Sequence, residues 1–277
     1  MFAFRIDVDC SHGLTKGAPK ILEILNELEM KASFYPVTGG ETGFFEAMQS
    51  KSKEKTSLKG VKLPKLEILR IALFPQNFFL KNSELLKKIK TQGHEVGCHG
   101  WKHREWTKDL EKLDLQNRFT RINEAFETVF SEKPKSFACP GFKINEKVLQ
   151  ALDDFGYACS GDLSGDYAFK PVVNGKEFNC VQVPVNCKFV DTTPLIEFFW
   201  KQGLSDPEII KKTSEFILKK EDEEGYAVFY CHAFFEGTRK TSVLKKVLER
   251  VKEAGVKNTT VEAIALKCRK EKEIKLV

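Results

Sequence analysis

Several features that would assign this 277-residue sequence to a common protein class are missing from it. No apolar run reaches the ~20 residues that a helix needs to cross a bilayer. Met1 leads directly into an apolar strand pattern at residues 2–8, so we expect no secretory signal peptide. No G-x-G-x-x-G motif follows that strand and no P-loop occurs, which argues against a nucleotide-binding fold. We expect a cytoplasmic protein, and peripheral contact with the inner face of the inner membrane stays open.

The eight cysteines include no C-x-x-C pair. This absence disfavours a zinc site made of cysteines, and without a secretory signal we expect reduced thiols instead of a disulfide framework. Lysine and arginine outnumber aspartate and glutamate by 45 to 39, which gives a net charge of +6. That mild excess is typical of solvated surface lysine, although it would also favour anionic lipid or phosphate. Because no nucleic-acid-binding motif is present, we expect no nucleic-acid partner.

Strand and helix patterns alternate along most of the chain. Apolar segments typical of strands alternate with amphipathic segments typical of helices, and the clearest of these helices are expected at 21–28, 109–130, 240–254 and 261–272. About seven strands separated by helices favour parallel pairing, either in an open sheet or in a barrel. No repeat or linker divides the chain, so we expect a single α/β domain over residues 1–277.

An insertion at residues 41–82 interrupts the alternation. Its first part, from Ser50 to Lys62, is polar and rich in lysine, whereas residues 63–82 mix leucine, isoleucine and phenylalanine with basic residues. Such a connection is far longer than usual and suggests a function of its own. Residues 63–82 are suited to peripheral contact with a membrane or to holding a lipid tail. An extra helix packed on the body of the protein is an equally good interpretation.

Three of the five histidines lie close together in the segment 93–103. His99 and His103 are four residues apart, so on a helical turn both rings would point the same way and could share one metal ion. Taken alone, this pair is as easily accidental. Gly100 follows the first histidine where the metalloprotease motif has a glutamate, so a base and a third ligand must come from elsewhere.

Other polar residues stand at the ends of predicted strands. Asp7 and Asp9 end the first strand, Asp162 follows the strand at 157–160, and His232 ends the strand at 226–231. The carboxyl ends of parallel strands meet at the face where α/β barrels build their active sites. Each residue alone has an ordinary structural explanation, such as a turn or a hydrogen-bonded core histidine. We interpret their convergence as one site.

The residue types suggest metal-assisted hydrolysis of an amide. Two histidines and one aspartate can hold a catalytic metal with an open position, and the second aspartate can act as general base. His232, from the far side of a barrel, can protonate the leaving amine. Zinc, iron, cobalt and manganese all suit such a ligand set, and we take zinc as the first expectation.

These motifs resemble those of the polysaccharide deacetylases with the NodB homology fold, a distorted (β/α) barrel. The resemblance runs from Arg5 to about Gly237 and is carried by Ile6-Asp7-Val8-Asp9, His99-Gly100-Trp101-Lys102-His103, Pro140-Gly141, Asp162 and Tyr230-Cys231-His232. It implies that Asp7 is the general base, that Asp9, His99 and His103 bind the metal, and that His232 is the general acid.

The resemblance also implies residues that bind substrate or support the catalytic groups. In the family, Asp162 orients a basic residue of the Pro140 segment, where this chain has Lys143 as the nearest basic residue and no arginine. Trp101, between the two histidines, is expected to pack beneath the metal or to form a wall for the sugar, and His94 is expected to be structural. The expected set of substrate-binding or supporting residues is Pro140, Gly141, Phe142, Lys143, Asp162, Trp101 and Glu236.

One branch of the family looks most similar: the lipid-linked formamido-arabinose deformylases of lipid A modification. The likeness is carried by 5–9, 94–97, Lys170-Pro171 and His232-Ala233-Phe234-Phe235-Glu236-Gly237. It implies a hydrolase of an N-acylated sugar, carried on undecaprenyl phosphate in that branch. Two alternatives stay open, a deacetylase of a soluble or cell-wall oligosaccharide or other non-peptide amide, and a non-catalytic carbohydrate-binding barrel.

Overall fold

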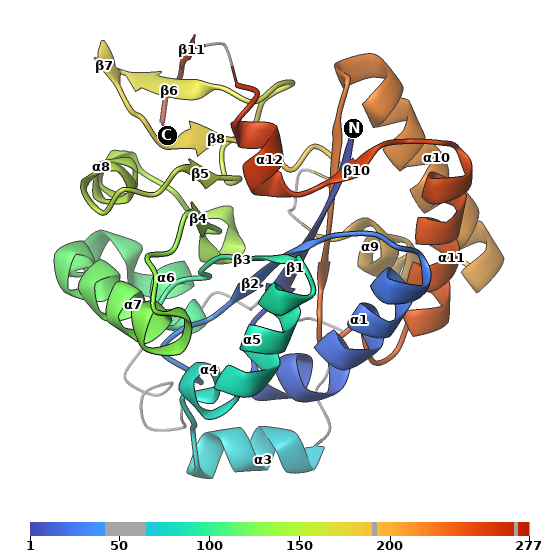
Figure 1. Cartoon of the computed structure of the whole chain (residues 1–277), viewed down its shortest axis with the longest axis horizontal. Helices are drawn as coiled ribbons and strands as arrows, with labels where there is room; N and C mark the ends of the chain where they lie inside the picture. Colours follow the sequence, from blue (N-terminus) through green and yellow to red (C-terminus); the bar gives the residue numbers. More distant parts are fainter. Residues whose placement is uncertain (42–64, 190–192, 269–270, 277) are drawn as a thin grey trace.

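The computed structural model describes residues 1–41, 65–189, 193–268 and 271–276 (Figure 1). The central strand, β1 (Phe2–Val8), is buried along its whole length, as its nearly unbroken apolar sequence requires. It pairs in parallel with β2 (Ser33–Pro36) on one side and with β9 (Ala227–His232) on the other. The same sheet contains β3 (Glu95–Val96), beside β2, and β10 (Asn258–Thr259), beside the start of β1.

A second parallel sheet continues the arrangement through β4 (Ser136–Phe137), β5 (Cys159–Ser160) and β8 (Val181–Gln182). Two isolated parallel bridges join it to the first sheet, one between Cys98 and Phe137 and one between Cys187 and Phe229. The strand pairings therefore follow a ring in the order β1, β2, β3, β4, β5, β8, β9. The expected α/β class is confirmed, and the ring is joined at two places by single bridges instead of full ladders.

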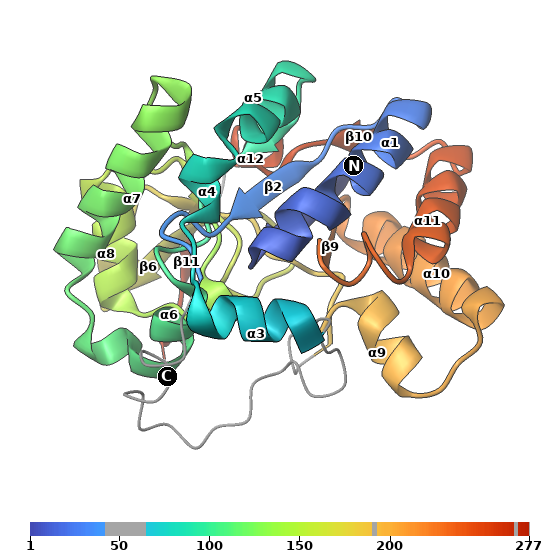
Figure 2. The same cartoon turned by 90° about the horizontal axis from the view of Figure 1, so that it is seen from below.

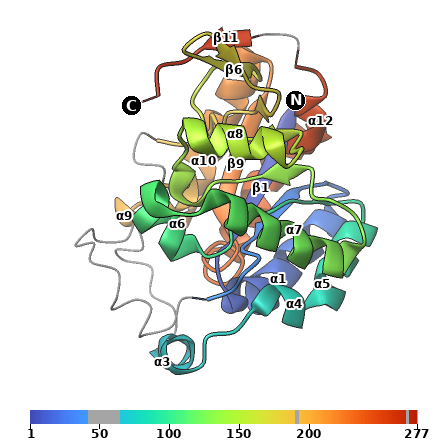
Figure 3. The ribbon, with the colours of Figure 1, turned by 90° about the vertical axis from the view of Figure 1, so that its left-hand side faces the viewer.

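Helices cover the outside of this ring (Figures 1 and 2). The longer ones are α1 (Ala18–Glu27), α5 (Ser83–Thr91), α7 (Leu115–Phe130), α8 (Glu146–Asp154), α10 (Asp206–Glu224) and α11 (Thr241–Glu253). Helix α3 (Lys65–Leu73) is as long as α5 and α8, and the shorter helices are α4 (Phe78–Lys81), α6 (His103–Asp109), α9 (Leu195–Lys201) and α12 (Val261–Ala265). Figure 3 shows α7 and α8 stacked on one side of the ring. A small third sheet contains β6 (Lys170–Val173), β7 (Lys176–Glu177) and β11 (Glu271–Glu273), and an antiparallel bridge between Phe169 and Gln182 joins it to β8.

Two predicted helices differ from those observed. The helix expected over 109–130 is interrupted, because Asp114 caps a new helix, α7, by accepting a hydrogen bond from the Asn117 backbone N–H. A 3₁₀ turn, Leu110–Lys112, separates α7 from α6. The helix expected over 261–272 ends at Ala265, because the chain then joins the third sheet, where Glu271–Glu273 pair in parallel with β6.

The insertion at 41–82 divides into parts with different surroundings, and its residues 42–64 lie outside the described residues. In α4, Phe78 and Phe79 are fully buried, and the Phe79 ring lies 6.3 Å from those of Phe126 and Phe130. In α3, by contrast, no residue is buried. The exposed apolar side chains of α3 and of the residue after it are Leu66, Ile68, Leu69, Leu73 and Phe74, and Leu80 of α4 is exposed as well. An extra packed helix is thus present in α4, while α3 leaves its leucines in solvent.

No helix in the described part of the chain combines the length and the apolar character needed to cross a membrane.

His94, just before β3, is held as a neutral imidazole. Its Nδ1 accepts the Ala32 backbone N–H at 3.2 Å, which requires that this nitrogen carry no proton. The ring lies edge-on to Phe34, with centroids 5.6 Å apart, and the residue is 4% exposed. Burial, together with the nearby Lys31 charge, lowers the pKa of His94 to about 4. His94 is therefore a core residue that stabilises the start of β3.

Protonation of His94 should destabilise the fold in mild acid. Because its folded pKa is about 4 and the ordinary value is 6.5, the unfolded chain binds more protons between these values, and the free energy of unfolding falls as pH drops. We expect His94 to contribute about 2 kcal/mol to the loss between pH 7.5 and pH 5. Urea unfolding of His94→Asn, whose amide oxygen replaces Nδ1, should show that much less pH dependence. His12→Asn is the control and should keep the wild-type dependence; equal curves for both variants would contradict the assignment.

Candidate active site

The predicted site residues meet at the carboxyl ends of the ring strands. Asp7 lies near the end of β1, opposite Tyr35 of β2 and His232 of β9 in the strand register. Asp9 follows β1, and His99 follows β3 in an extended loop whose N–H is bonded to the Pro36 carbonyl. Because these strands are parallel, their ends bring the two aspartates and the histidines to one edge.

Asp9, His99 and His103 form a compact group of potential metal ligands. The Asp9 Oδ1 atom lies 3.4 Å from His99 Nε2 and 4.0 Å from His103 Nε2. One ligand atom from each residue falls within 4.8 Å of the other two. The two histidines do not share a helical turn, since His99 belongs to the loop and His103 is the first residue of α6. Their ring centroids nevertheless lie 5.4 Å apart. The loop therefore brings the two imidazoles together, as a shared helical turn was expected to do.

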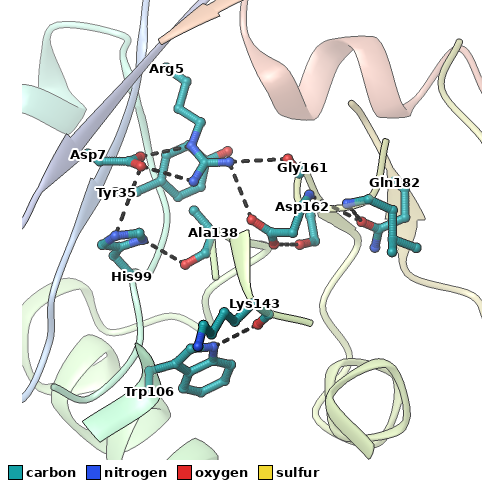
Figure 4. A network of polar contacts seen from close by, with 12 residues as sticks. Arg5, Asp7, Tyr35, His99, Trp106, Ala138, Lys143, Gly161, Asp162 and Gln182 are labelled. Atoms are coloured by element: carbon teal, nitrogen blue, oxygen red, sulfur yellow. Dashed lines mark hydrogen bonds and ion pairs between the residues drawn. The ribbon is translucent and has the colours of Figure 1, made fainter. Parts of the chain in front are cut away.

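The hydrogen bonds around this group fit a divalent cation. His99 Nδ1 lies 2.7 Å from the Ala138 carbonyl (Figure 4), which places its proton there. The lone pair of Nε2 is then free to face Asp9, 3.4 Å away. Asp9 Oδ1 is buried and has no hydrogen-bond donor among the described residues. A lone pair facing a carboxylate oxygen in a buried place requires a positive charge between them. Two imidazole nitrogens and one carboxylate oxygen are a common ligand set for catalytic divalent metals.

The electrostatics of the group lead to the same interpretation. Burial by itself would raise the pKa of Asp9, but His103, His99 and His232 hold it below its usual range. Burial would lower the pKa of His99, but Asp7 and Asp9 raise it. The cluster therefore favours ionised aspartate and attracts either protons or a metal ion. The same nitrogen and oxygen atoms can hold protons or a metal ion, so a bound metal would compete with protons for them.

Asp7 is held by a buried arginine on its own strand. Arg5 Nε donates to Asp7 Oδ1 at 2.8 Å and Arg5 Nη2 donates to Oδ2 at 3.0 Å, which is a bidentate pair. The remaining Nη1 donates to the Gly161 carbonyl at 3.3 Å and lies 3.5 Å from Asp162 Oδ1 (Figure 4). Burial opposes ionisation of Asp7, but Arg5 and His99 lower its pKa. The carboxylate is thus ionised and fixed in orientation.

Asp162 contacts a basic residue, but that residue comes from β1. The resemblance placed a basic partner in the Pro140 segment, with Lys143 nearest, and that role stays a prediction; the structure shows Arg5 Nη1 3.5 Å from Asp162 Oδ1. The Lys143 backbone carbonyl accepts the Trp106 indole N–H at 2.9 Å. Ser160 Oγ also donates to Asp162. Arg5 was missed as a functional residue, although an arginine inside an otherwise apolar strand was the signal that could have identified it.

His232 lies on the other side of the metal group. Its Nε2 is 3.9 Å from Asp9 Oδ2, and its Nδ1 is 3.9 Å from Glu197 Oε2. Glu197 is 2% exposed and forms an ion pair with Lys201, 3.6 Å away. At this separation the two groups form no hydrogen bond, and His232 Nδ1 has no hydrogen-bond partner among the described residues. Glu197 was also missed from the sequence; its only signal is a glutamate within the apolar run of α9.

Glu236 stabilises the backbone at His232 without reaching the surface. It is fully buried, and its Oε2 accepts the His232 N–H at 3.0 Å. Burial and the neighbouring Glu197 carboxylate raise the pKa of Glu236 well above its usual range. It is therefore a neutral acid, and it supports the general-acid segment from behind.

The remaining expected residues form the walls near the metal group. Trp101 is 9% exposed; its carbonyl accepts the Gly39 N–H at 2.7 Å, and Arg121 lies 4.2 Å from its ring centroid. A Cβ atom on Gly39 would fall 2.3 Å from the indole, so this packing requires glycine. Pro140–Phe142 form a turn in which Phe142 has a φ of 56°, and its ring contacts the Arg5 guanidinium at 4.6 Å.

Comparison with known proteins shows consistent similarities. Residues 8–160 match the model of the family described as polysaccharide deacetylase. Two curated relatives are each named "Probable 4-deoxy-4-formamido-L-arabinose-phosphoundecaprenol deformylase". The protein from Wigglesworthia glossinidia brevipalpis is 25% identical over 82% of this chain and 79% of its own length. The protein from Shewanella sediminis is 24% identical over 91% and 81%, respectively.

Solved structures share the fold at lower identity. A crystal structure described as a "putative polysaccharide deacetylase" from Mycobacterium smegmatis matches with a TM-score of 0.64 and 18% identity. The match covers 100% of this chain and 94% of that chain. It supports the ring of parallel strands described above.

Loss of either histidine ligand should release the metal. Purified without chelators and supplied with zinc, the wild-type protein should hold about one equivalent, and His99→Ala or His103→Ala should bind it at least 10-fold more weakly. Elemental mass spectrometry and competition with a zinc-binding dye measure this independently of activity. His94→Asn is the matched control and should keep its metal. Equal metal content in all of these proteins would exclude the ligand assignment.

Proposed function

The chain belongs to the polysaccharide deacetylase family, hydrolases of the amide bonds of N-acylated sugars, and we propose that it deformylates an amino sugar linked through phosphate to a lipid. The observation that supports catalysis is one cluster of side chains at the carboxyl ends of the ring strands, which we call the ring mouth. It contains Asp7, Asp9, His99, His103 and His232. A binding module would have no use for an ionised carboxylate and a histidine on opposite sides of a metal site.

The residues divide the chemistry as follows. A divalent metal held by Asp9, His99 and His103, with zinc as our first candidate, supplies Lewis acidity at the amide carbonyl. Asp7, fixed by Arg5, accepts the proton of the attacking water. His232 donates a proton to the sugar nitrogen as the carbon–nitrogen bond breaks, and the Glu197 carboxylate, 3.9 Å from Nδ1, favours the positively charged ring before that transfer. Formate and the free amine are the products.

Two observations support a lipid-linked substrate. The names of the two curated relatives describe a substrate in which a sugar is joined to phosphoundecaprenol. In addition, the exposed apolar helix α3 is tied to the loop that follows Asp9: Arg70 of α3 bonds Glu41 at 2.5 Å, and Glu41 accepts the Ser11 N–H at 3.2 Å. A lipid chain that extends from the site would therefore pass beside the exposed leucines of α3. Lys65 on α3 and the lysines of 51–62 in the sequence suit a membrane of anionic lipid.

Substitution of the base or the acid should stop deformylation while the metal is retained. We expect Asp7→Asn and His232→Gln each to lower kcat by 10²- to 10⁴-fold, because each removes one proton transfer. The assay measures the released acid by chromatography, with formamido and acetamido sugars offered side by side. Asp166→Asn, in the loop after β5, is the control and should remain fully active. Undiminished release by both variants would exclude the mechanism, and release of acetate alone would exclude the deformylase.

Charges on α3 should separate membrane docking from chemistry. We expect the double variant Leu66→Glu, Leu69→Glu to lose binding to vesicles that contain anionic lipid, because 82% and 55% of these side chains are exposed and available to lipid. Activity on a lipid-linked substrate should fall, whereas a short water-soluble formamido sugar should be hydrolysed as before. Leu266→Glu, at an equally exposed leucine on another face, is the matched control. Unchanged vesicle binding in the double variant would remove α3 from the membrane contact.

A further inference from the structure

A half-buried lysine lies at the rim of the site without an assigned role. Lys188 follows Cys187, whose bridge to Phe229 joins the second sheet to β9. Since the two segments run in parallel, Lys188 lies toward the same end of the ring as His232. It also forms an isolated bridge with Pro194, directly before the helix that carries Glu197. Its main chain is thus fixed on both sides at the ring mouth.

The side chain of Lys188 is placed against the residues that hold the base. Its Nζ lies 3.7 Å from the centroid of the Phe142 ring, and the same ring lies 4.6 Å from the Arg5 guanidinium carbon. Phe142 has a left-handed backbone conformation, with a φ of 56°. Its ring therefore contacts both the Lys188 ammonium group and the Arg5 guanidinium that holds Asp7.

The charge of Lys188 is unusual among the buried cations of this region. Arg5 is paired with Asp7 and Asp162, and Lys201 is paired with Glu197. Among the described residues, no carboxylate forms an ion pair with Lys188, whose nearest partner is the Phe142 ring. Burial and the Arg5 charge lower the pKa of Lys188 to about 8, against a smaller opposing effect of the Asp162 carboxylate, so most of the group is still cationic at pH 7. A half-buried ammonium that forms no ion pair with any described residue is costly, and an anionic ligand would offset that cost.

We propose that Lys188 binds the phosphate that joins the substrate sugar to its carrier. This inference rests on the proposed function and specifies which end of the substrate enters beside Phe142. The ammonium group offers three donors as a compact point charge, which suits a phosphate oxygen whose exact position varies with the sugar. Arg5 is unavailable for this purpose because its donors are used by Asp7, Gly161 and Asp162. The phosphate and the acyl group would then lie on opposite sides of the sugar.

The decisive comparison uses two substrates and two variants. Lys188→Met removes the charge and keeps the apolar stem, whereas Lys188→Arg keeps the charge. On a formamido sugar 1-phosphate, we expect Lys188→Met to raise KM about 10- to 100-fold with kcat nearly unchanged, as expected for loss of a charged hydrogen bond. On the methyl glycoside of the same sugar, which has no phosphate, KM should not change. Lys188→Arg should keep a KM for the phosphate within a few-fold of wild type.

Each result decides the question. Equal losses on both substrates would overturn the proposal, because they would mean that Lys188 only supports Phe142 and Arg5. Thermal unfolding of both variants identifies a folding defect, and Lys246→Met, an exposed lysine on α11 paired with Glu249, is the matched control.

Calorimetric titration with inorganic phosphate tests binding without catalysis. If no acyl sugar is hydrolysed but Lys188→Met still abolishes phosphate binding, the deformylase function fails and the anion site stands. Absence of phosphate binding by the wild type would overturn the site itself.

Discussion

The bidentate pair between Arg5 and Asp7 determines how the rest of the site is arranged. Both residues belong to β1, the central strand, and both are almost fully buried. Burial of a single charge there would be prohibitive, so the two must be present together, and the remaining donor of Arg5 needs Asp162 and Gly161. Tyr35, Phe142 and Tyr230 surround the guanidinium and exclude water from it. Through Arg5, this one ion pair therefore connects Asp7 with the surrounding aromatic rings and with the loop that follows β5.

The same pair separates two jobs that carboxylates do in this site. Asp7 has both oxygens bonded to arginine, whereas Asp9, two residues later, faces histidine nitrogens. Different partners give these neighbouring aspartates different surroundings, which suit the two roles proposed for them, proton acceptor for Asp7 and metal ligand for Asp9. On the far side, Glu197 and Glu236 repeat the division, with one carboxylate facing His232 and one neutral acid bonded to its backbone. Four acidic groups thus share a small volume without sharing a role.

Much of this arrangement could be predicted from the sequence because it depends on local pattern. Strand ends followed by Asp7, Asp9, His99 and His232 are visible as apolar runs that stop at polar residues, and parallel topology brings such ends together. Arg5 and Glu197 could not be found in this way. Their roles depend on partners that are distant in the chain, such as Asp162, which lies 157 residues from Arg5. Likewise, an apolar helix has the same sequence pattern whether it is packed, as α4 is, or exposed, as α3 is.

The two isolated bridges that join the sheets have a mechanical meaning. Each immediately precedes a residue of the mouth, Cys98 before His99 and Cys187 before Lys188. Full ladders hold β1 to β2 and to β9, so the strand that carries the base is the stiffest part of the ring. The joints at the bridges have few hydrogen bonds and are its most compliant part. Any widening of this edge of the ring would therefore fall on the joints beside His99 and Lys188, and Asp7 on the central strand would keep its place.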